Sequence, residues 1–275
     1  LLMGTARPIV DAEQNDGTYY SPRRVGAGLV DAQGATTASV YPSVVGAVDP
    51  SRPKADLGDG TSGWTFQVTL TNVSDTARTY TLGGQALSEK VESMLFTHHS
   101  MNWAGQGIDL TFSSDSVTVP AKGSTTVTVT VTPREAFASY AAENTPKGTF
   151  IDGAVTFTGA DGAPNLTVPY VGFYGSWGAP AIFDLVTPDN HISGYGSTFM
   201  SGRLPFGQQS PFDVEDERMI NGVNPDLLVI SRSTQEDART AVTPGTVLLR
   251  SVPSLTYTFR NEAGETIRSF TCGRA

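Results

Sequence analysis

The chain has 275 residues, a formal net charge of −9 and one cysteine. This acidity argues against a nucleic-acid partner, because that affinity depends on lysine and arginine neutralising phosphates. A single thiol excludes an intramolecular disulfide, and Cys272, with no histidine near it in sequence, is expected to be an ordinary residue. No apolar run reaches the roughly 18 residues of a membrane-spanning helix, so no transmembrane span is predicted.

Residues 1–37 are predicted to form a short helical and loop segment. Residues 1–3 read as the last turn of a helix, which Gly4 brings to an end. A polar loop follows. The stretch "LVDAQGA" at 29–35 then predicts the start of another short helix, with Asp31 near its first turn.

Residues 38–178 read as β-strands throughout. In "WTFQVTLT" at 64–71, apolar residues alternate with polar ones, which places one set on a core face and the other toward solvent. The stretch "SVTVPAKGSTTVTVTVTP" at 116–133 predicts two strands joined by a Pro/Gly turn. Two further strands are predicted at 148–159 and 166–175. Because no helical pattern separates these strands, they indicate a sandwich of two antiparallel sheets.

Residues 179–275 are weakly periodic and begin with a stretch rich in glycine and proline. Strands are predicted at 226–232 and within 246–270, and "NEAGE" at 261–265 predicts the turn of a hairpin. So few strands would cover a core poorly. We therefore expect a second β-sandwich that is incomplete.

The histidines are the first candidates for chemistry. His98 and His99 precede Ser100, but neighbours on a strand point to opposite faces, so adjacency in sequence gives no triad geometry. Further metal ligands at a recognisable spacing are missing nearby. We interpret these three residues, and the isolated His191, as ordinary loop residues.

Two acidic clusters are candidates for calcium binding. They are "DLGDG" at 56–60 and "DVEDE" at 213–217. Neither fits the D-x-D-x-D-G pattern of an EF-hand loop, so both are predicted to be solvated acidic loops.

Four aromatic residues close the second region, and they could form a platform for a carbohydrate or a peptide. Their alternation favours instead a division between core and surface, with Trp177 at a domain junction. Gly172 and Gly175 fit a close backbone approach at the same corner. The four aromatic residues are Tyr170, Phe173, Tyr174 and Trp177.

The motifs along the chain resemble one family. "LLMGTARP" at 1–8 and "SPRRVGAGLVDAQGA" at 21–35 resemble the C-terminal end of the subtilisin-like serine protease domain. "KGTFIDGAVTF" at 147–157 and "LTVPYVGFYGSWGAPAIFD" at 166–184 resemble the fibronectin-type-III-like domain of large cell-envelope subtilases, of the lactocepin and the streptococcal complement-cleaving types. "LLRSVPSLTYTFRNEAGETI" at 248–267 is similar to their second sandwich domain.

The resemblance implies a domain organisation. Residues 1–37 would be the C-terminal tail of a subtilisin-like catalytic domain, 38–178 a fibronectin-type-III-like β-sandwich, and 179–275 a second, truncated sandwich-like domain. The family's catalytic Asp, His and Ser precede such a tail, and this chain has no motif like "GTSMAAP" or "HGT". We assign no catalytic, cofactor-binding or metal-ligating residue. No cofactor is predicted; calcium sites occur in the family, but none is placed here.

The resemblance also implies a function. The chain would be the non-catalytic C-terminal accessory region of an extracellular serine endopeptidase, secreted or held at the bacterial cell envelope. Its partners would be an upstream catalytic domain and the enzyme's protein or peptide substrate, with no nucleic acid and no membrane span. An alternative is a β-sandwich adhesion or ligand-binding module without protease activity. The coding sequence upstream of Leu1 would distinguish the two.

A severed tail makes a physical prediction of its own. Apolar side chains of residues 1–37 that have lost a partner domain should be locally disordered or exposed to solvent. The side chains concerned are Leu1, Leu2, Met3, Leu29 and Val30. Strong protection of 1–37 against hydrogen exchange would count against this interpretation.

Overall fold

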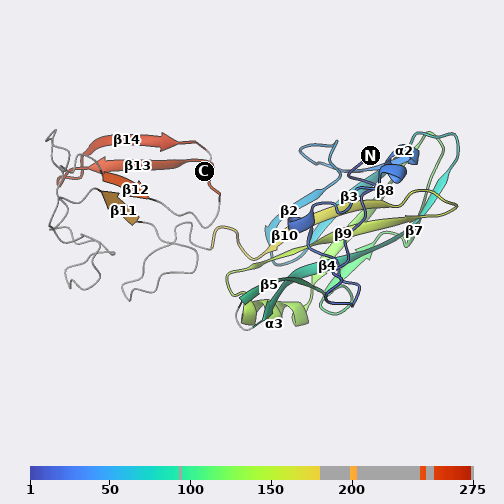
Figure 1. Cartoon of the computed structure of the whole chain (residues 1–275), viewed down its shortest axis with the longest axis horizontal. Helices are drawn as coiled ribbons and strands as arrows, with labels where there is room; N and C mark the ends of the chain where they lie inside the picture. The colour runs from blue at the N-terminus through green and yellow to red at the C-terminus, as the bar shows by residue number, and fades with distance from the viewer. Residues whose placement is uncertain (93–94, 180–198, 203–241, 246–250, 274–275) are drawn as a thin grey trace. The chain divides into compact units, whose positions relative to one another are not determined.

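The computed structural model describes residues 1–92, 95–179, 199–202, 242–245 and 251–273 (Figure 1). The chain divides into two compact units, Leu1–Pro180 and Ala181–Ala275. Each unit is considered by itself.

The first sheet of the first unit has four antiparallel strands. Their order is β1 (Val40–Val44), β3 (Trp64–Asn72), β8 (Ser124–Pro133) and β6 (Ile108–Phe112). The predicted alternation in β3 is confirmed, because Phe66, Val68 and Leu70 are buried. Thr65 and Thr69 lie on the other face, where their hydroxyls bond to those of threonines on β8 at 3.2 and 2.9 Å.

The second sheet has six strands. The order is β2 (Ala55–Gly60), β10 (Leu166–Tyr174), β9 (Thr149–Gly159), β4 (Arg78–Glu92) and β5 (Leu95–Asn102), and β7 (Ser116–Val119) also pairs with β4. All pairings are antiparallel except that of β2 with β10. The register of β2 shifts between Asp56 and Asp59, where β2 carries one residue more than β10.

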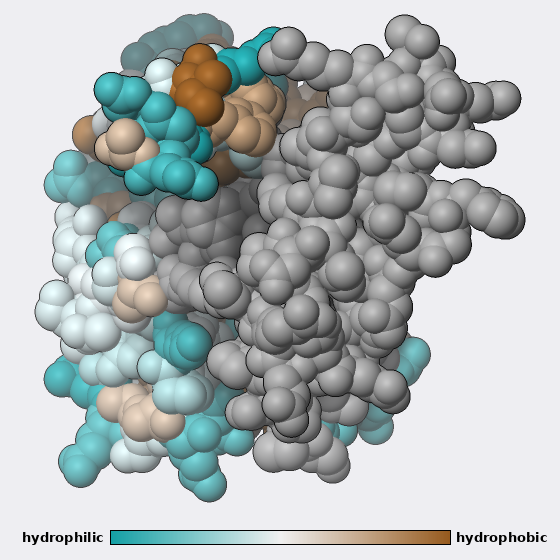
Figure 2. Space-filling view, turned by 90° about the vertical axis from the view of Figure 1, so that its left-hand side faces the viewer, coloured by the Kyte–Doolittle hydropathy of each residue, from teal (hydrophilic) through white to brown (hydrophobic). Residues whose placement is uncertain are grey.

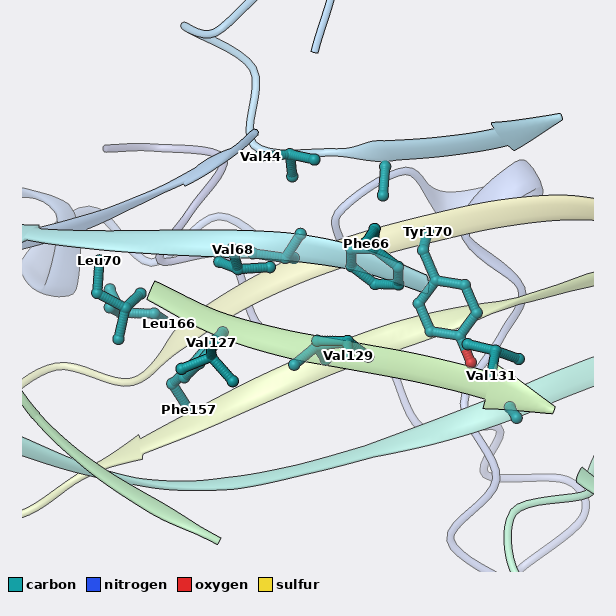
Figure 3. Close-up of a cluster of buried hydrophobic side chains, with 14 of the residues drawn as sticks. Val44, Phe66, Val68, Leu70, Val127, Val129, Val131, Phe157, Leu166 and Tyr170 are labelled. Carbon is teal, nitrogen blue, oxygen red and sulfur yellow. The ribbon is translucent and has the colours of Figure 1, made fainter. Parts of the chain in front are cut away.

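The core lies between the two sheets (Figure 3). Phe66 of β3 meets Tyr170 of β10 with ring centroids 5.8 Å apart. Leu166 and Phe157, from the second sheet, are fully buried in the same cluster. Each such side chain contributes about 1.5–3 kcal/mol by leaving water. The predicted fold class, mainly β with antiparallel sheets, is confirmed.

The two strands predicted within 116–133 are confirmed as β7 and β8. They do not pair with each other, because β7 pairs with β4, and β8 pairs with β3 and β6. The turn at 120–123 therefore carries the chain from one sheet to the other. The sequence also gave no sign of helix α3 (Glu135–Asn144), which buries only Phe137 and Ala141 and so shows little periodicity.

Residues 1–37, here called the leading segment, lie against the second sheet. The predicted short helix is present as α2 (Ala32–Thr37), and Asp31 caps it by accepting a 2.7 Å hydrogen bond from the Gly34 N–H. A second helix, α1 (Pro22–Val25), was not predicted. Residues 1–3 lie in a turn in which the Thr5 N–H donates to the Leu1 carbonyl at 3.0 Å, the spacing of a single helical turn, in agreement with the prediction.

The expected exposure of apolar side chains in the leading segment is confirmed. Leu1, Leu2, Leu29 and Val30 are 55–60% exposed, whereas Met3 is partly buried. The backbone is nevertheless hydrogen-bonded, since Arg7 and Leu29 exchange two N–H···O bonds of 2.8 Å. On the face shown in Figure 2, the described residues are mostly hydrophilic, and hydrophobic ones occur in small groups.

The described part of the second unit consists of two two-stranded sheets. One pairs β11 (Phe199–Gly202) with β12 (Val242–Gly245), and the other pairs β13 (Leu255–Arg260) with β14 (Thr266–Cys272). The hairpin turn predicted at 261–265 is confirmed, because the Asn261 N–H donates to the Glu265 carbonyl at 3.0 Å. The strand predicted at 226–232, the acidic cluster at 213–217 and His191 lie outside the described residues.

Candidate interaction site

His98, His99 and Ser100 lie on strand β5, not in a loop. β5 pairs with β4, with Glu89 opposite Ser100, so the loop interpretation was wrong. The reason is that β4 is 15 residues long, much longer than its apolar pattern suggests. The C-terminal end of β4 pairs with the polar residues of β5.

His99 is held by carboxylates of the leading segment. Its Nδ1 lies 2.5 Å from Asp11 Oδ2, and its Nε2 lies 3.6 Å from Glu13 Oε2. Asp11 is completely buried. Burial acts to raise the pKa of Asp11, but hydrogen bonds from His99 and from the Glu13 N–H outweigh it and hold this pKa below its usual value. The pair therefore ties the leading segment to β5.

A second polar cluster forms where the leading segment crosses β9. Asp152 of β9 is completely buried. Its Oδ2 accepts hydrogen bonds from Ser21 Oγ at 2.5 Å and Arg23 Nε at 2.6 Å. The Arg23 guanidinium also lies 2.5 Å from Glu89 Oε1, and Thr149 Oγ1 donates to the other Glu89 oxygen at 2.9 Å.

The electrostatics of this cluster depend on Arg23. Burial raises the pKa of Asp152, and the charge of Arg23 opposes that shift. Asp152 Oδ1 has no hydrogen-bond partner among the described residues, which makes the carboxylate more dependent on its cation. One feature of the sequence could have indicated this site: Asp152 is the only charged residue in β9, where it lies between Ile151 and Gly153.

An apolar pocket of about 620 Å³ lies beside this cluster. Three of its aromatic rings contact one another: the Phe173 centroid is 5.2 Å from that of Phe150 and 5.0 Å from that of Trp177. The Arg23 guanidinium lies 4.3 Å from the centre of the Phe150 ring. The pocket is lined by Met3, Pro22, Gly26, Lys54, Ala55, Asp56, Gly58, Asp59, Phe150, Pro169, Val171, Gly172, Phe173 and Trp177.

The predicted division of the aromatic residues between core and surface is confirmed, whereas the placement of Trp177 at a domain junction stays a prediction. Tyr170 and Phe173 are buried, and Tyr174 is partly buried against Phe137 at 5.1 Å between ring centroids. Trp177 is 42% exposed at the pocket. Gly172 lies against the Trp64 ring, where a Cβ would come within 3.1 Å, so close approach is required there as predicted.

The acidic stretch at 56–60 is a strand, not the predicted loop. It forms β2, whose positive φ of 69° at Gly58 accommodates the extra residue. Asp59 Oδ2 accepts a 2.6 Å hydrogen bond from the Trp177 N–H. Within the described ranges, no three His, Cys, Asp or Glu side chains come together as a metal ion would require. No helix there is long and apolar enough to cross a membrane.

The chain is similar to one known domain family and to two groups of bacterial proteases. Residues 56–171 match the Fn3-like domain family. The PI-type proteinase of Lactococcus lactis subsp. cremoris is 32% identical over 184 residues, 66% of this chain but 9% of the proteinase. The C5a peptidase of Streptococcus pyogenes serotype M1 is 29% identical over 179 residues, 65% of this chain and 14% of the peptidase.

The chain thus spans only a small part of these relatives. It contains an Fn3-like domain at residues 56–171 and is homologous to a region of the lactococcal proteinases and the streptococcal C5a peptidases, the subtilisin-like family that its motifs resemble.

Proposed function

We propose that this chain is the non-catalytic accessory region of an extracellular subtilisin-like serine endopeptidase, secreted or held at the cell envelope. The complete enzyme would hydrolyse peptide bonds with a serine nucleophile, a histidine base and an aspartate that orients it. The chain would position the catalytic domain and contribute to substrate binding. Homology to a proteinase and to a C5a peptidase supports this proposal.

One observation carries it. The leading segment, which resembles the end of a subtilase domain, is bonded to the Fn3-like sandwich yet leaves apolar side chains exposed, including Leu2 and Leu29. A contiguous group of exposed apolar side chains is typical of a surface that contacts another protein, whereas single exposed ones are ordinary. The catalytic domain would pack on this surface, and the rigid sandwich would fix its orientation.

Peptide hydrolysis tests the proposal. The polypeptide encoded together with the sequence upstream of Leu1 should cleave casein, and a serine-directed inhibitor should stop the cleavage. The 275-residue chain alone should release no peptides under the same conditions. Inhibitor-sensitive cleavage by the chain alone would overturn the proposal, as would a start codon directly upstream of Leu1.

A ligand-binding module is the second candidate, and the pocket at Trp177 favours it. An exposed tryptophan beside Phe150 and Phe173 offers an apolar surface to a peptide or a sugar. Under this alternative, Trp177→Ala should abolish binding of the chain to its ligand. Under the accessory-region proposal, Trp177→Ala should change the cleavage of casein by the complete enzyme. The chain should still fold, because the Trp177 side chain is not needed for folding.

A further inference from the structure

The contact between the leading segment and the second sheet buries charge from both sides. Asp11 of the leading segment and Asp152 of β9 are both completely buried. A buried carboxylate is strongly destabilising unless a cation or several hydrogen-bond donors accompany it. The source of each cation therefore shows which parts of the chain depend on one another.

Each of the two carboxylates finds its partner on the other part of the chain. Asp152 of the sheet receives its cation, Arg23, from the leading segment. Asp11 of the leading segment is paired in turn with the His99 Nδ1 of the sheet. If the two parts separated, both pairs would be lost together.

Further hydrogen bonds fix the register of the leading segment between these two pairs. The Gln85 side chain of β4 acts as a backbone would: its Oε1 accepts from the Tyr19 N–H at 2.9 Å, and its Nε2 donates to the Gly17 carbonyl at 2.8 Å. Gln14 Nε2 donates to the Ser100 carbonyl at 2.9 Å. At the other end of the segment, the Thr167 N–H of β10 donates to the Gly4 carbonyl at 2.8 Å.

We propose that the outer face of the second sheet is a docking surface whose partner is the leading segment of the same chain. The two are locked into one cooperative folding unit by the reciprocal pairs Arg23–Asp152 and His99–Asp11. The segment is a strap of the sandwich and not a linker before it. This inference does not rest on the proposed function, since it concerns only contacts within residues 1–180. It replaces the expectation that the amides of residues 1–37 are weakly protected, because this segment is hydrogen-bonded to the sandwich and only some of its apolar side chains are exposed.

Hydrogen exchange on the intact 275-residue chain tests the strap. Peptides covering residues 5–11 and 18–29 carry amides bonded within the strap, such as those of Arg7, Tyr20 and Leu29. In a single cooperative unit, these amides exchange through the same opening as the amides of β9 and β4, with rates within about tenfold of them.

Substitutions of Arg23 test whether its pair with Asp152 holds this unit together. Arg23→Ala removes the cation of Asp152 and should accelerate exchange in the strap and in β9 alike, by about a hundredfold or more. The matched control is Arg134→Ala, which breaks the Arg134–Asp109 pair of 2.5 Å on the surface, where the side chains are 60% and 43% exposed. That variant should change strap exchange by less than about fivefold. Arg23→Lys keeps the charge and serves if Arg23→Ala does not fold.

The outcomes are decisive in either direction. Strap amides that exchange in the wild-type chain as fast as unstructured peptides, while β9 stays protected, would overturn the proposal. So would equal effects of the Arg23 and Arg134 substitutions. Loss of the fold in Arg23→Ala, together with acceleration of strap and β9 amides by the same factor in Arg23→Lys, would support it, whereas acceleration confined to the strap would overturn it. None of these results depends on whether the complete protein hydrolyses peptides.

Discussion

The ion pair between Arg23 and Asp152 should be strongly coupled energetically, and a double-mutant cycle would measure this. Asp152 has no exposed side-chain surface and Arg23 is 25% exposed, with 2.6 Å between Nε and Oδ2. Removing Arg23 leaves two carboxylates, those of Asp152 and Glu89, without their cation. Breaking a buried pair costs about 3–5 kcal/mol, and the partial exposure of Arg23 places the expected loss near about 3 kcal/mol.

Removing Asp152 should cost less, about 2 kcal/mol, because Arg23 keeps Glu89 as a partner. The double variant Arg23→Ala/Asp152→Ala should lose about 3 kcal/mol, not the sum of the single losses, so the coupling free energy is about 2 kcal/mol. Urea unfolding of the four proteins, followed by the fluorescence of Trp64 and Trp103 in the first unit, gives these free energies.

The exposed pair Arg134–Asp109 provides the control cycle, with an expected coupling of about 0.2–1 kcal/mol. Similar coupling energies in the two cycles would refute the reasoning, because burial would then add nothing. An additive Arg23/Asp152 cycle would show that the 2.6 Å contact has no energetic consequence.

Three further predictions concern pH, the core and the backbone. Because the pKa of Asp11 is lower in the folded state than its ordinary value of 3.8, its ionisation stabilises the protein above that value. This stability is lost as the pH falls below about 3.8 through the folded pKa. Acid unfolding curves of Asp11→Asn should therefore lack this loss, and an unchanged acid midpoint relative to wild type would contradict the assignment. Phe157→Ala should lower the free energy of unfolding by about 3–5 kcal/mol in urea, because the ring is fully buried; a loss below about 1 kcal/mol would contradict the packing. Gly28→Ala should cost more than about 1 kcal/mol, because Gly28 has φ of 108° and a Cβ would lie 2.0 Å from the Arg7 carbonyl oxygen; thermal unfolding unchanged from wild type would show that Gly28 does not approach Arg7 this closely.

Strands could be predicted from the sequence where alternation is regular. Phe66, Val68 and Leu70 recur at every second position, and this period is sufficient to assign β3 and its buried face. Alternation says nothing about the partner of a strand. Val117 and Val129 follow the same pattern on consecutive strands, yet they belong to different sheets, because the turn between them crosses the sandwich.

The polar contacts of the leading segment could not be predicted in the same way. Arg23 and Asp152 are 129 positions apart in sequence, and Asp11 and His99 are 88 apart. No local pattern links such residues; only a buried charge in an apolar strand, as at Asp152, signals that a partner must come from elsewhere. Helix α3 could not be predicted for a different reason. It buries only Phe137 and Ala141, and these two residues do not form the apolar stripe that identifies an amphipathic helix.

The irregular register of β2 has a consequence for assembly. Among the described strands, β2 pairs only with β10, so its outer side presents unused peptide groups at the margin of the sheet. A strand from a neighbouring molecule could extend the sheet there only if its amides and carbonyls matched the hydrogen-bond register of β2. The additional residue between Asp56 and Asp59 interrupts that register. The carboxylates of Asp56 and Asp59 also disfavour the approach of an apolar strand. Both features disfavour the pairing of β2 with a strand of another molecule.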